Sequence, residues 1–225
     1  MNAMDFMSRC KAAKVSRWAC LYFVAAFPAA AVLPSWVGWE NGPVEILQDI
    51  VLLIGAIYCM MLFRRESGRY RHGLWLTAST YFLILLGREL SWGRVFLPNG
   101  MTDHGPEFVS MHALPYYKVV YGVIAVAILL TVLSFALYMP WRRIFEEIPA
   151  PVLALVLIAA AAIVAMLGDK GLLLGDTFDE TLEEEMELLV YLLNIYLAHW
   201  YYRGLECADG VHSLKMNNRS NFRMR

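Results

Sequence analysis

Residues 74–96 read LWLTASTYFLILLGRELSWGRVF, and this stretch indicates the class of fold. It is apolar and long enough to cross a bilayer, which takes about 20 helical residues. Near its end it carries Arg88 and Glu89. A charged side chain at the bilayer centre costs roughly 2.5–3.5 kcal/mol on insertion scales, so such residues usually face a protein interior or a water-filled cavity. The stretch therefore predicts a membrane helix that leads into a polar site.

Composition supports a membrane protein. Of the 225 residues, 59% are hydrophobic and 17% are charged, whereas about 25% are charged in an ordinary soluble domain. The apolar residues are gathered into runs of bilayer length rather than spread with the period of a soluble core. We therefore predict an all-α, polytopic membrane helical bundle in a lipid bilayer. The net charge of −1 gives no reason to expect nucleic-acid binding.

About six membrane-spanning helices are expected from these apolar runs. They cover residues 18–37, 44–63, 74–96, 119–139, 152–168 and 186–202. A basic head at 1–17 and a basic tail at 204–225 flank this transmembrane domain, which extends over 18–203. The first run also fits a cleaved signal peptide, because Pro28 is followed by alanines, but it continues to Trp36. Either interpretation leaves the orientation of the later spans unchanged.

The orientation follows from the positions of Lys and Arg, which collect in cytoplasmic loops. The head, the tail and two loops are basic, and they alternate with loops that are poor in Lys and Arg. The basic loops contain Arg64, Arg65, Arg69 and Arg71 in one case and Arg142 and Arg143 in the other. Both termini are therefore expected in the cytoplasm. The cysteines at 10, 20, 59 and 207 all lie on or near that side, away from an oxidising compartment.

This orientation places polar residues from four separated segments at the outer membrane boundary. They are Glu45, Gln48 and Asp49 of the second span, Arg88, Glu89 and Trp92 of the third, Glu107 and His112 of the next loop, and Glu187 of the sixth. The first three stand at i, i+3 and i+4, so they share one helical face. Carboxylates that close repel each other unless a cation, a proton or an arginine lies between them. The convergence of these segments is the main functional signal in the sequence.

Helical spacing extends the prediction along two spans. Arg88 precedes Trp92 by four residues, which predicts a cation–π pair. Polar side chains also form stripes that should line the bundle interior: Thr77, Tyr81 and Arg88 on the third span, and Glu187, Tyr191, Asn194 and Tyr201 on the sixth.

Candidate roles follow from the chemistry of these side chains. A carboxylate core would act as general acid and base or bind a divalent cation; it consists of Glu89, Asp49 and Glu187. His112 would complete a metal shell or shuttle a proton near neutral pH. Arg88 would hold an anionic head group, because a guanidinium suits phosphate geometry. The other substrate-binding candidates are Trp92, Glu45, Gln48 and Glu107. The metal, if any, stays open, because Glu107 and His112 lack a recognised zinc spacing.

Simpler explanations exist for the same residues. Glu45 and Glu183 could be acids in a first helical turn, where they complement the helix dipole. Arg88 and Glu89 could be members of interhelical salt bridges that stabilise the packing. The sequence contains no HExxH motif, nucleophile elbow, phosphate loop or dinucleotide fingerprint.

Three short motifs resemble a known group of proteins: RELSWGRVF at 88–96, PEFVSMH at 106–112 and EEEMELL at 183–189. They are similar to motifs of a little-characterised family of bacterial multi-pass inner-membrane proteins. In that family the pattern E-E-x-S-W-G-Q-x-x-F precedes a glutamate and a histidine, and a late helix begins with E-E-x-x-E-L. This chain has Arg88 where an acid is usual and Arg94 where Gln is usual. The resemblance implies a bacterial inner membrane with the outer face in the periplasm, and it supplies no activity.

Three functions are consistent with these observations. The first is an enzyme that acts on a lipid or lipid-linked glycan at the periplasmic leaflet. The second is a structural or accessory subunit, in a homo-oligomer or a larger envelope complex, whose ion pairs serve assembly. The third is a small proton-coupled transporter, in which carboxylates would alternate between protonated and paired states. The mostly apolar inner halves of the spans weigh against transport, which needs a polar path to the cytoplasm.

Overall fold

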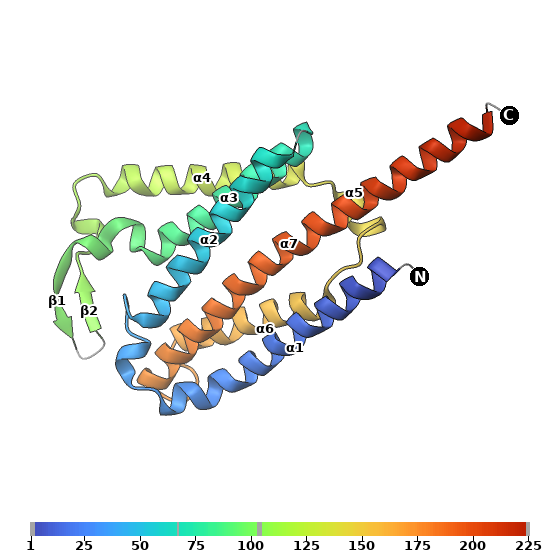
Figure 1. Ribbon diagram of the computed structural model, residues 1–225. Coiled ribbons are helices and arrows are strands. Elements are labelled where there is room, and N and C mark those ends of the chain that lie inside the picture. Colours follow the sequence, from blue (N-terminus) through green and yellow to red (C-terminus); the bar gives the residue numbers. More distant parts are fainter. Residues whose placement is uncertain (1–2, 67, 103–104, 224–225) are drawn as a thin grey trace.

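The computed structural model describes residues 3–66, 68–102 and 105–223. It is a bundle of long helices with a β-hairpin at one end (Figure 1). The α-helices are α1 (Ala3–Val32), α2 (Pro43–Arg65), α3 (Arg69–Glu89), α4 (Tyr117–Tyr138), α5 (Trp141–Glu146), α6 (Val152–Asp169) and α7 (Asp176–Arg223). Short 3-10 helices lie at η1 (Ser35–Val37), η2 (Ser91–Phe96) and η3 (Met111–Ala113), and the antiparallel strands are β1 (Pro98–Thr102) and β2 (Gly105–Phe108). The predicted helical bundle is confirmed, with the hairpin as an addition.

Four helices of the described chain are long and apolar enough to cross a membrane. They are Lys14–Val32 within α1, together with α2, α4 and α6. Much of their surface is apolar and exposed, including Ile54 of α2 and Val123 of α4. Exposed apolar side chains on long helices are what a lipid environment requires. The membrane class of the protein follows from these helices.

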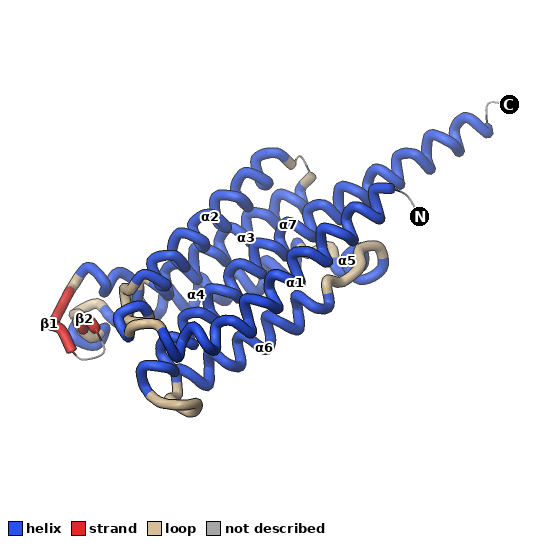
Figure 2. The backbone as a smooth tube through the Cα atoms, turned by 60° about the horizontal axis from the view of Figure 1, so that its bottom comes forward, coloured by secondary structure: helices blue, strands red, loops and turns tan. Residues whose placement is uncertain are grey.

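Helix α7 is the central element of the bundle. It packs against α1, α2 and α6, while α3 lies between α2 and α4 (Figure 2). One core lies among α2, α3 and α7 and contains Leu52, Phe82 and Leu205. A second core packs alanines of α1 and α6 against Leu182 and Met186 of α7. Small side chains allow membrane helices to approach closely, which explains the alanines at this interface.

The third predicted span, 74–96, is wrong at its C-terminal end. Helix α3 ends at Glu89, and the chain continues as the 3-10 segment η2. Within it, Trp92 and Gly93 have φ angles of 55° and 90°. These left-handed conformations are incompatible with a continuing α-helix. The SWGR stretch is therefore a turn at the end of the bundle.

The basic segments gather at one end of the molecule. The basic head is continuous with α1, and the basic tail is continuous with α7. Both termini, α5 and the connection between α2 and α3 lie at the end opposite the hairpin (Figure 1). The starts of α2 and α7 and the end of α3 lie toward the hairpin, and they supply the polar residues described next.

Candidate functional site

A group of polar side chains lies where α2 begins, α3 ends and α7 begins. Pro43 occupies the first turn of α2, a position that tolerates proline because its missing N–H would have no partner there. Glu45 in the same turn accepts a hydrogen bond from the backbone N–H of Asn41. We call the following residues the acidic cluster: Glu45, Gln48, Arg88, Glu89, Glu183, Glu184, Glu187 and Tyr191.

Arg88 joins two carboxylates from different helices. Its Nε donates to Oε1 of Glu89 at 2.9 Å, and its Nη2 donates to Oε2 of Glu187. The hydroxyl of Tyr191 lies 2.6 Å from the same Glu89 oxygen and 3.3 Å from Oε2 of Glu187. The Glu89 side chain is only 6% exposed, whereas that of Arg88 is 53% exposed. The network therefore links α3 to α7 and has one charged side chain open to the surroundings.

Gln48 links α2 to the start of α7. Its residue is fully buried, and its Nε2 donates to the backbone oxygen of Glu184 at 2.8 Å and to Oε2 of Glu184 at 2.7 Å. The other end of this amide, Oε1, is buried and accepts no hydrogen bond from the described residues. Oδ1 of the next residue, Asp49, is also buried and accepts no hydrogen bond from the described residues. The atoms left unsatisfied on this part of α2 are thus acceptors.

Carboxylates outnumber the guanidinium in the acidic cluster, and this affects their ionisation. Glu183 and Glu184 precede the sixth expected span. Burial, and after it the neighbouring carboxylates with Glu45 the strongest, raises the pKa of Glu184 to about 9. Burial also raises the pKa of Glu183 to about 7, with Glu187 the strongest neighbour. The acidic cluster therefore retains protons near neutral pH.

The structure brings together five of the residues singled out from sequence, in one network or within electrostatic range: Glu45, Gln48, Arg88, Glu89 and Glu187. Asp49 lies one helical turn after Glu45 on α2, without a hydrogen bond to the cluster from the described residues. The predicted polar stripes of the third and sixth spans also contact each other: Asn194 donates a hydrogen bond of 3.1 Å to the hydroxyl of Tyr81. Sequence reasoning did not find the pairing of Gln48 with Glu184, because no spacing within one helix contains it.

Two predicted site residues lie elsewhere. The His112 ring packs against Tyr117 and Tyr121, with centroid distances of 5.0 and 5.9 Å. Glu107 is exposed on β2. No contact described in the structure joins either residue to the acidic cluster. The hairpin and η3 separate them from the helix ends, and the sequence analysis did not predict that hairpin.

The predicted cation–π pair of Arg88 and Trp92 does not form among the described residues. The four-residue spacing assumed a continuous helix, but α3 ends between the two residues. The Trp92 ring instead lies against Gly87, where an added Cβ would be only 2.7 Å from the ring. Arg88 is consequently left to its two carboxylate partners.

Metal binding receives no geometric support from the described residues. They contain no group of three or more His, Cys, Asp or Glu side chains that could hold a metal ion. Arg88 occupies the space between Glu89 and Glu187 instead.

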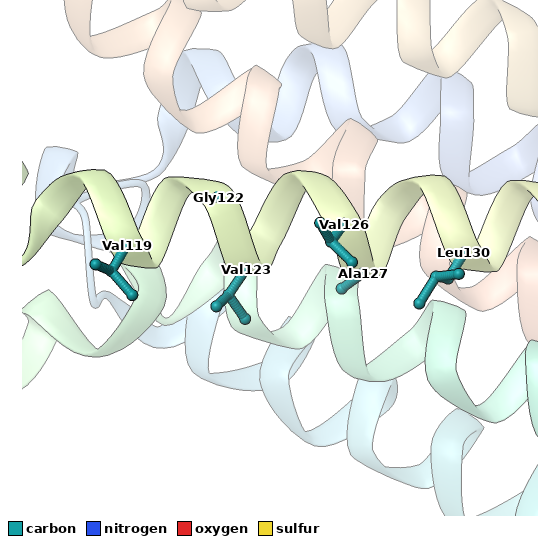
Figure 3. Close-up of a pocket in the computed structure, with 6 residues that line it drawn as sticks. All are labelled: Val119, Gly122, Val123, Val126, Ala127 and Leu130. Carbon is teal, nitrogen blue, oxygen red and sulfur yellow. The ribbon is translucent and has the colours of Figure 1, made fainter.

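The surface also has apolar grooves that are separate from the acidic cluster. One, of about 450 Å³, follows α4 along Val119, Gly122, Val123, Val126, Ala127 and Leu130 (Figure 3). Another, of about 310 Å³, lies between α2 and α7, where the Tyr58 hydroxyl is 2.9 Å from Nδ1 of His199. The α4 groove is shallow and lined by aliphatic side chains, as expected of a lipid-facing helix.

Comparison with known proteins finds no matching family model, no matching curated protein and no matching solved structure. The class rests on the fold and the site alone. The chain is a helical membrane protein with an acidic, arginine-bridged cluster at the hairpin end of its bundle.

Proposed function

We propose that this protein is a bacterial inner-membrane protein with six spans that acts on a lipid or lipid-linked glycan at the periplasmic leaflet. Helices α3 and α7 would supply the two spans beyond the four apolar helices. Both pack along α2 (Figure 2), which is long and apolar enough to span the bilayer. Helices α3 and α7 would therefore lie at the same depth in the membrane as α2. Their polar residues are tolerated because they meet inside the bundle.

The orientation of the proposal has both termini in the cytoplasm. Arg64, Arg65, Arg142 and Arg143 belong to segments at the same end as the termini (Figure 1), which is the cytoplasmic end under the positive-inside rule. A reporter that is active only in the cytoplasm, fused after Arg225, should therefore be active. An inactive C-terminal reporter, with an active one inserted in the hairpin, would reverse the orientation and remove the acidic cluster from the periplasmic face.

One observation supports chemistry at the acidic cluster: Glu89 and Glu187, from helices far apart in the sequence, share Arg88 and Tyr191. Buried carboxylates with a hydroxyl partner are suited to accept and return a proton during a reaction. The exposed part of Arg88 gives this network access to the membrane boundary. An ion network of this kind inside a membrane bundle is a functional site by default.

The test compares the lipids and lipid-linked glycans of cells with the gene deleted and cells that express variants. Glu89→Gln and Glu187→Gln keep side-chain volume but remove a charge, and both should reproduce the deletion while the protein still accumulates. Glu146→Gln removes the same charge from the exposed surface of α5 at the opposite end of the bundle and should behave as wild type. A deletion that leaves every lipid and glycan unchanged would refute the enzymatic proposal.

A specific observation also favours the structural alternative. Arg88, Glu89, Glu187 and Tyr191 are hydrogen-bonded to one another, as in an interhelical tie. In a structural or accessory subunit this tie would serve assembly, in a homo-oligomer or an envelope complex. Under this alternative, Glu89→Gln and Glu187→Gln would fail to accumulate, or would accumulate without their complex, and membrane lipids would not change.

A further inference from the structure

The hydrogen-bonding deficit of the acidic cluster is a deficit of donors. Gln48 is fully buried, and its amide lies in the cluster because Nε2 donates to the Glu184 carboxylate. Its Oε1 has no partner among the described residues. A buried acceptor without a donor is unfavourable, so such atoms in native proteins usually have a partner that is not a protein atom. The partner that Gln48 lacks must supply an N–H, an O–H or a cation that an amide oxygen can coordinate.

The acidic cluster also has less positive than negative charge. Glu45, Glu89, Glu183 and Glu187 all lie within electrostatic range of Glu184. Arg88 is the guanidinium that balances them, and it is already engaged by Glu89 and Glu187. This occupancy argues against the sequence-based expectation that Arg88 holds an anionic head group. The cluster is better matched to a ligand that is both positively charged and rich in donors.

A primary ammonium group has these properties. It carries a positive charge, three N–H donors and no acceptor. A metal ion could also satisfy the amide oxygen by coordination, but the described residues contain no group of three or more His, Cys, Asp or Glu side chains that could hold one. A trimethylammonium group also carries the charge but has no N–H. Because Oε1 of Gln48 needs a donor, the cluster should prefer a primary ammonium head group to a trimethylammonium head group.

We propose that the acidic cluster binds a primary ammonium group, with Oε1 of Gln48 accepting one N–H and the Glu184 and Glu45 carboxylates compensating the charge. This inference rests on the proposed function, because it names the head-group chemistry of the substrate at the same site. The ammonium can belong to a lipid head group or to a soluble amine. The position of the cluster at the hairpin end of the spanning helices is compatible with both.

The first experiment measures head-group preference with the purified full-length protein in nanodiscs. Phosphatidylethanolamine, phosphatidylcholine and phosphatidylglycerol with identical acyl chains compete for the protein, and bound lipid is counted by native mass spectrometry. Phosphatidylethanolamine should be retained about tenfold more tightly than phosphatidylcholine, which corresponds to about 1.4 kcal/mol. Equal retention of these two lipids, together with equal binding of soluble ethanolamine and choline, would overturn the proposal.

The soluble amines identify the source of the ammonium. Ethanolamine that displaces phosphatidylethanolamine at similar concentration, where choline does not, supports the ammonium site and assigns it to amines in general. Preference for the intact lipid without competition by ethanolamine supports the site and assigns it to the lipid.

Variants then connect the preference to the cluster. Gln48→Met has a similar volume and no acceptor oxygen, so the preference for phosphatidylethanolamine over phosphatidylcholine should fall about tenfold. Glu184→Gln keeps Gln48 and removes the carboxyl that would ionise to compensate the ammonium charge, so binding of both zwitterionic lipids should weaken. Glu146→Gln, on the exposed surface of α5 at the opposite end of the bundle, is the matched control and should retain the wild-type preference. If Gln48→Met does not fold, the selectivity of the wild type and the affinity of Glu184→Gln still decide, and phosphatidylethanolamine binding that is as tight in Glu184→Gln as in wild type overturns the proposal.

Failure of this inference is distinguishable from failure of the proposed function. A selective ammonium site in a protein whose deletion changes no lipid supports a binding protein rather than an enzyme. A deletion that alters lipids without amino groups, combined with no ammonium preference, retains the enzyme and refutes the ammonium site.

Discussion

The hydroxyl of Tyr191 donates a hydrogen bond of 2.6 Å to Oε1 of Glu89, although 102 residues separate the two along the chain. The same hydroxyl lies 3.3 Å from Glu187. A phenol has one hydrogen, so it can donate fully to only one of these carboxylates at a time. Arg88 contacts both carboxylates, so it stabilises the carboxylate that does not accept the hydrogen bond from Tyr191. This arrangement connects α3 to α7 at the hairpin end of the bundle.

Replacing Tyr191 with Phe should reduce stability measurably. Tyr191→Phe removes a hydrogen bond to a buried charged group, which is worth about 1.5–3 kcal/mol. The free energy of unfolding in detergent, or the thermal midpoint, measures this loss. Tyr196→Phe on the same helix is the matched control, because the buried Tyr196 hydroxyl has no partner among the described residues. Equal destabilisation by both variants would show that the phenol of Tyr191 makes no net contribution.

A glycine contact sets the distance between α2 and α3. A Cβ atom at Gly55 would lie 2.7 Å from Cδ1 of Phe82, a side chain that is only 2% exposed. Gly55→Ala should therefore destabilise the protein by about 1–3 kcal/mol through overpacking. Gly122→Ala on α4 has no atom within 4 Å of the added Cβ, so it should be neutral or slightly stabilising. Thermal unfolding of the two variants in the same detergent tests the difference, and a stable Gly55→Ala variant would contradict this packing.

The loop before α7 depends on the ionised form of Asp179. Burial alone would raise the pKa of this carboxyl, but hydrogen bonds from the backbone N–H groups of Leu174, Leu173 and Gly175 lower it below its usual value. A depressed carboxyl pKa contributes stability above the unfolded value, about 3.9, and the contribution is lost as pH falls through the folded pKa. The free energy of unfolding of Asp179→Asn should therefore fall less between neutral and acid pH than that of wild type.

At neutral pH, Asp179→Asn should be less stable by about 1–2 kcal/mol, as expected for loss of a charged acceptor at the start of a helix. A variant as stable as wild type at pH 7, with the same acid transition, would show that these N–H groups are satisfied without the charge. Glu107→Gln, exposed on the hairpin, serves as the control.

Ammonium binding to the acidic cluster should tighten as pH rises. The raised pKa values of Glu184, about 9, and Glu183, about 7, mean that both carboxyls hold protons below those values. A bound ammonium favours the ionised carboxylates and must displace these protons, so its affinity increases with pH by at most about tenfold per unit for each proton released. The other charged groups that face them are Glu45 of α2, Arg88 and Glu89 of α3, Asp169 of α6 and Glu187 of α7.

Affinity for phosphatidylethanolamine between about pH 6 and pH 9 measures this linkage. The ligand-free protein should change in the opposite direction. Because the folded pKa values are raised, the stability that these groups contribute is complete below the unfolded pKa and decreases as pH rises through about 7 to 9. Affinity that is constant or falls over this range would contradict proton displacement.

The membrane class and most of the helices could be predicted from the sequence. The apolar runs of α2, α4 and α6 were evident because a bilayer requires long, nearly uncharged helices. The meeting of Glu45, Arg88 and Glu187 was also predictable, since charged residues in apolar helices must find one another or water. Local chemistry could not predict the end of α3, because it depends on left-handed backbone at Trp92 and Gly93. The position of His112 could not be predicted either, because it follows the hairpin.

The contacts of each acid at the start of α7 depend on how the helices pack. Glu184 binds Gln48 of α2, Glu185 accepts a hydrogen bond from Tyr22 of α1, and Glu187 binds Arg88 of α3. In sequence these glutamates are equivalent members of an acidic run. Their roles differ because burial of Leu182, Met186 and Leu189 against the alanines of α1 and α6 sets the rotation of α7 about its axis. That rotation is a property of the packed bundle, and a local sequence pattern does not contain it.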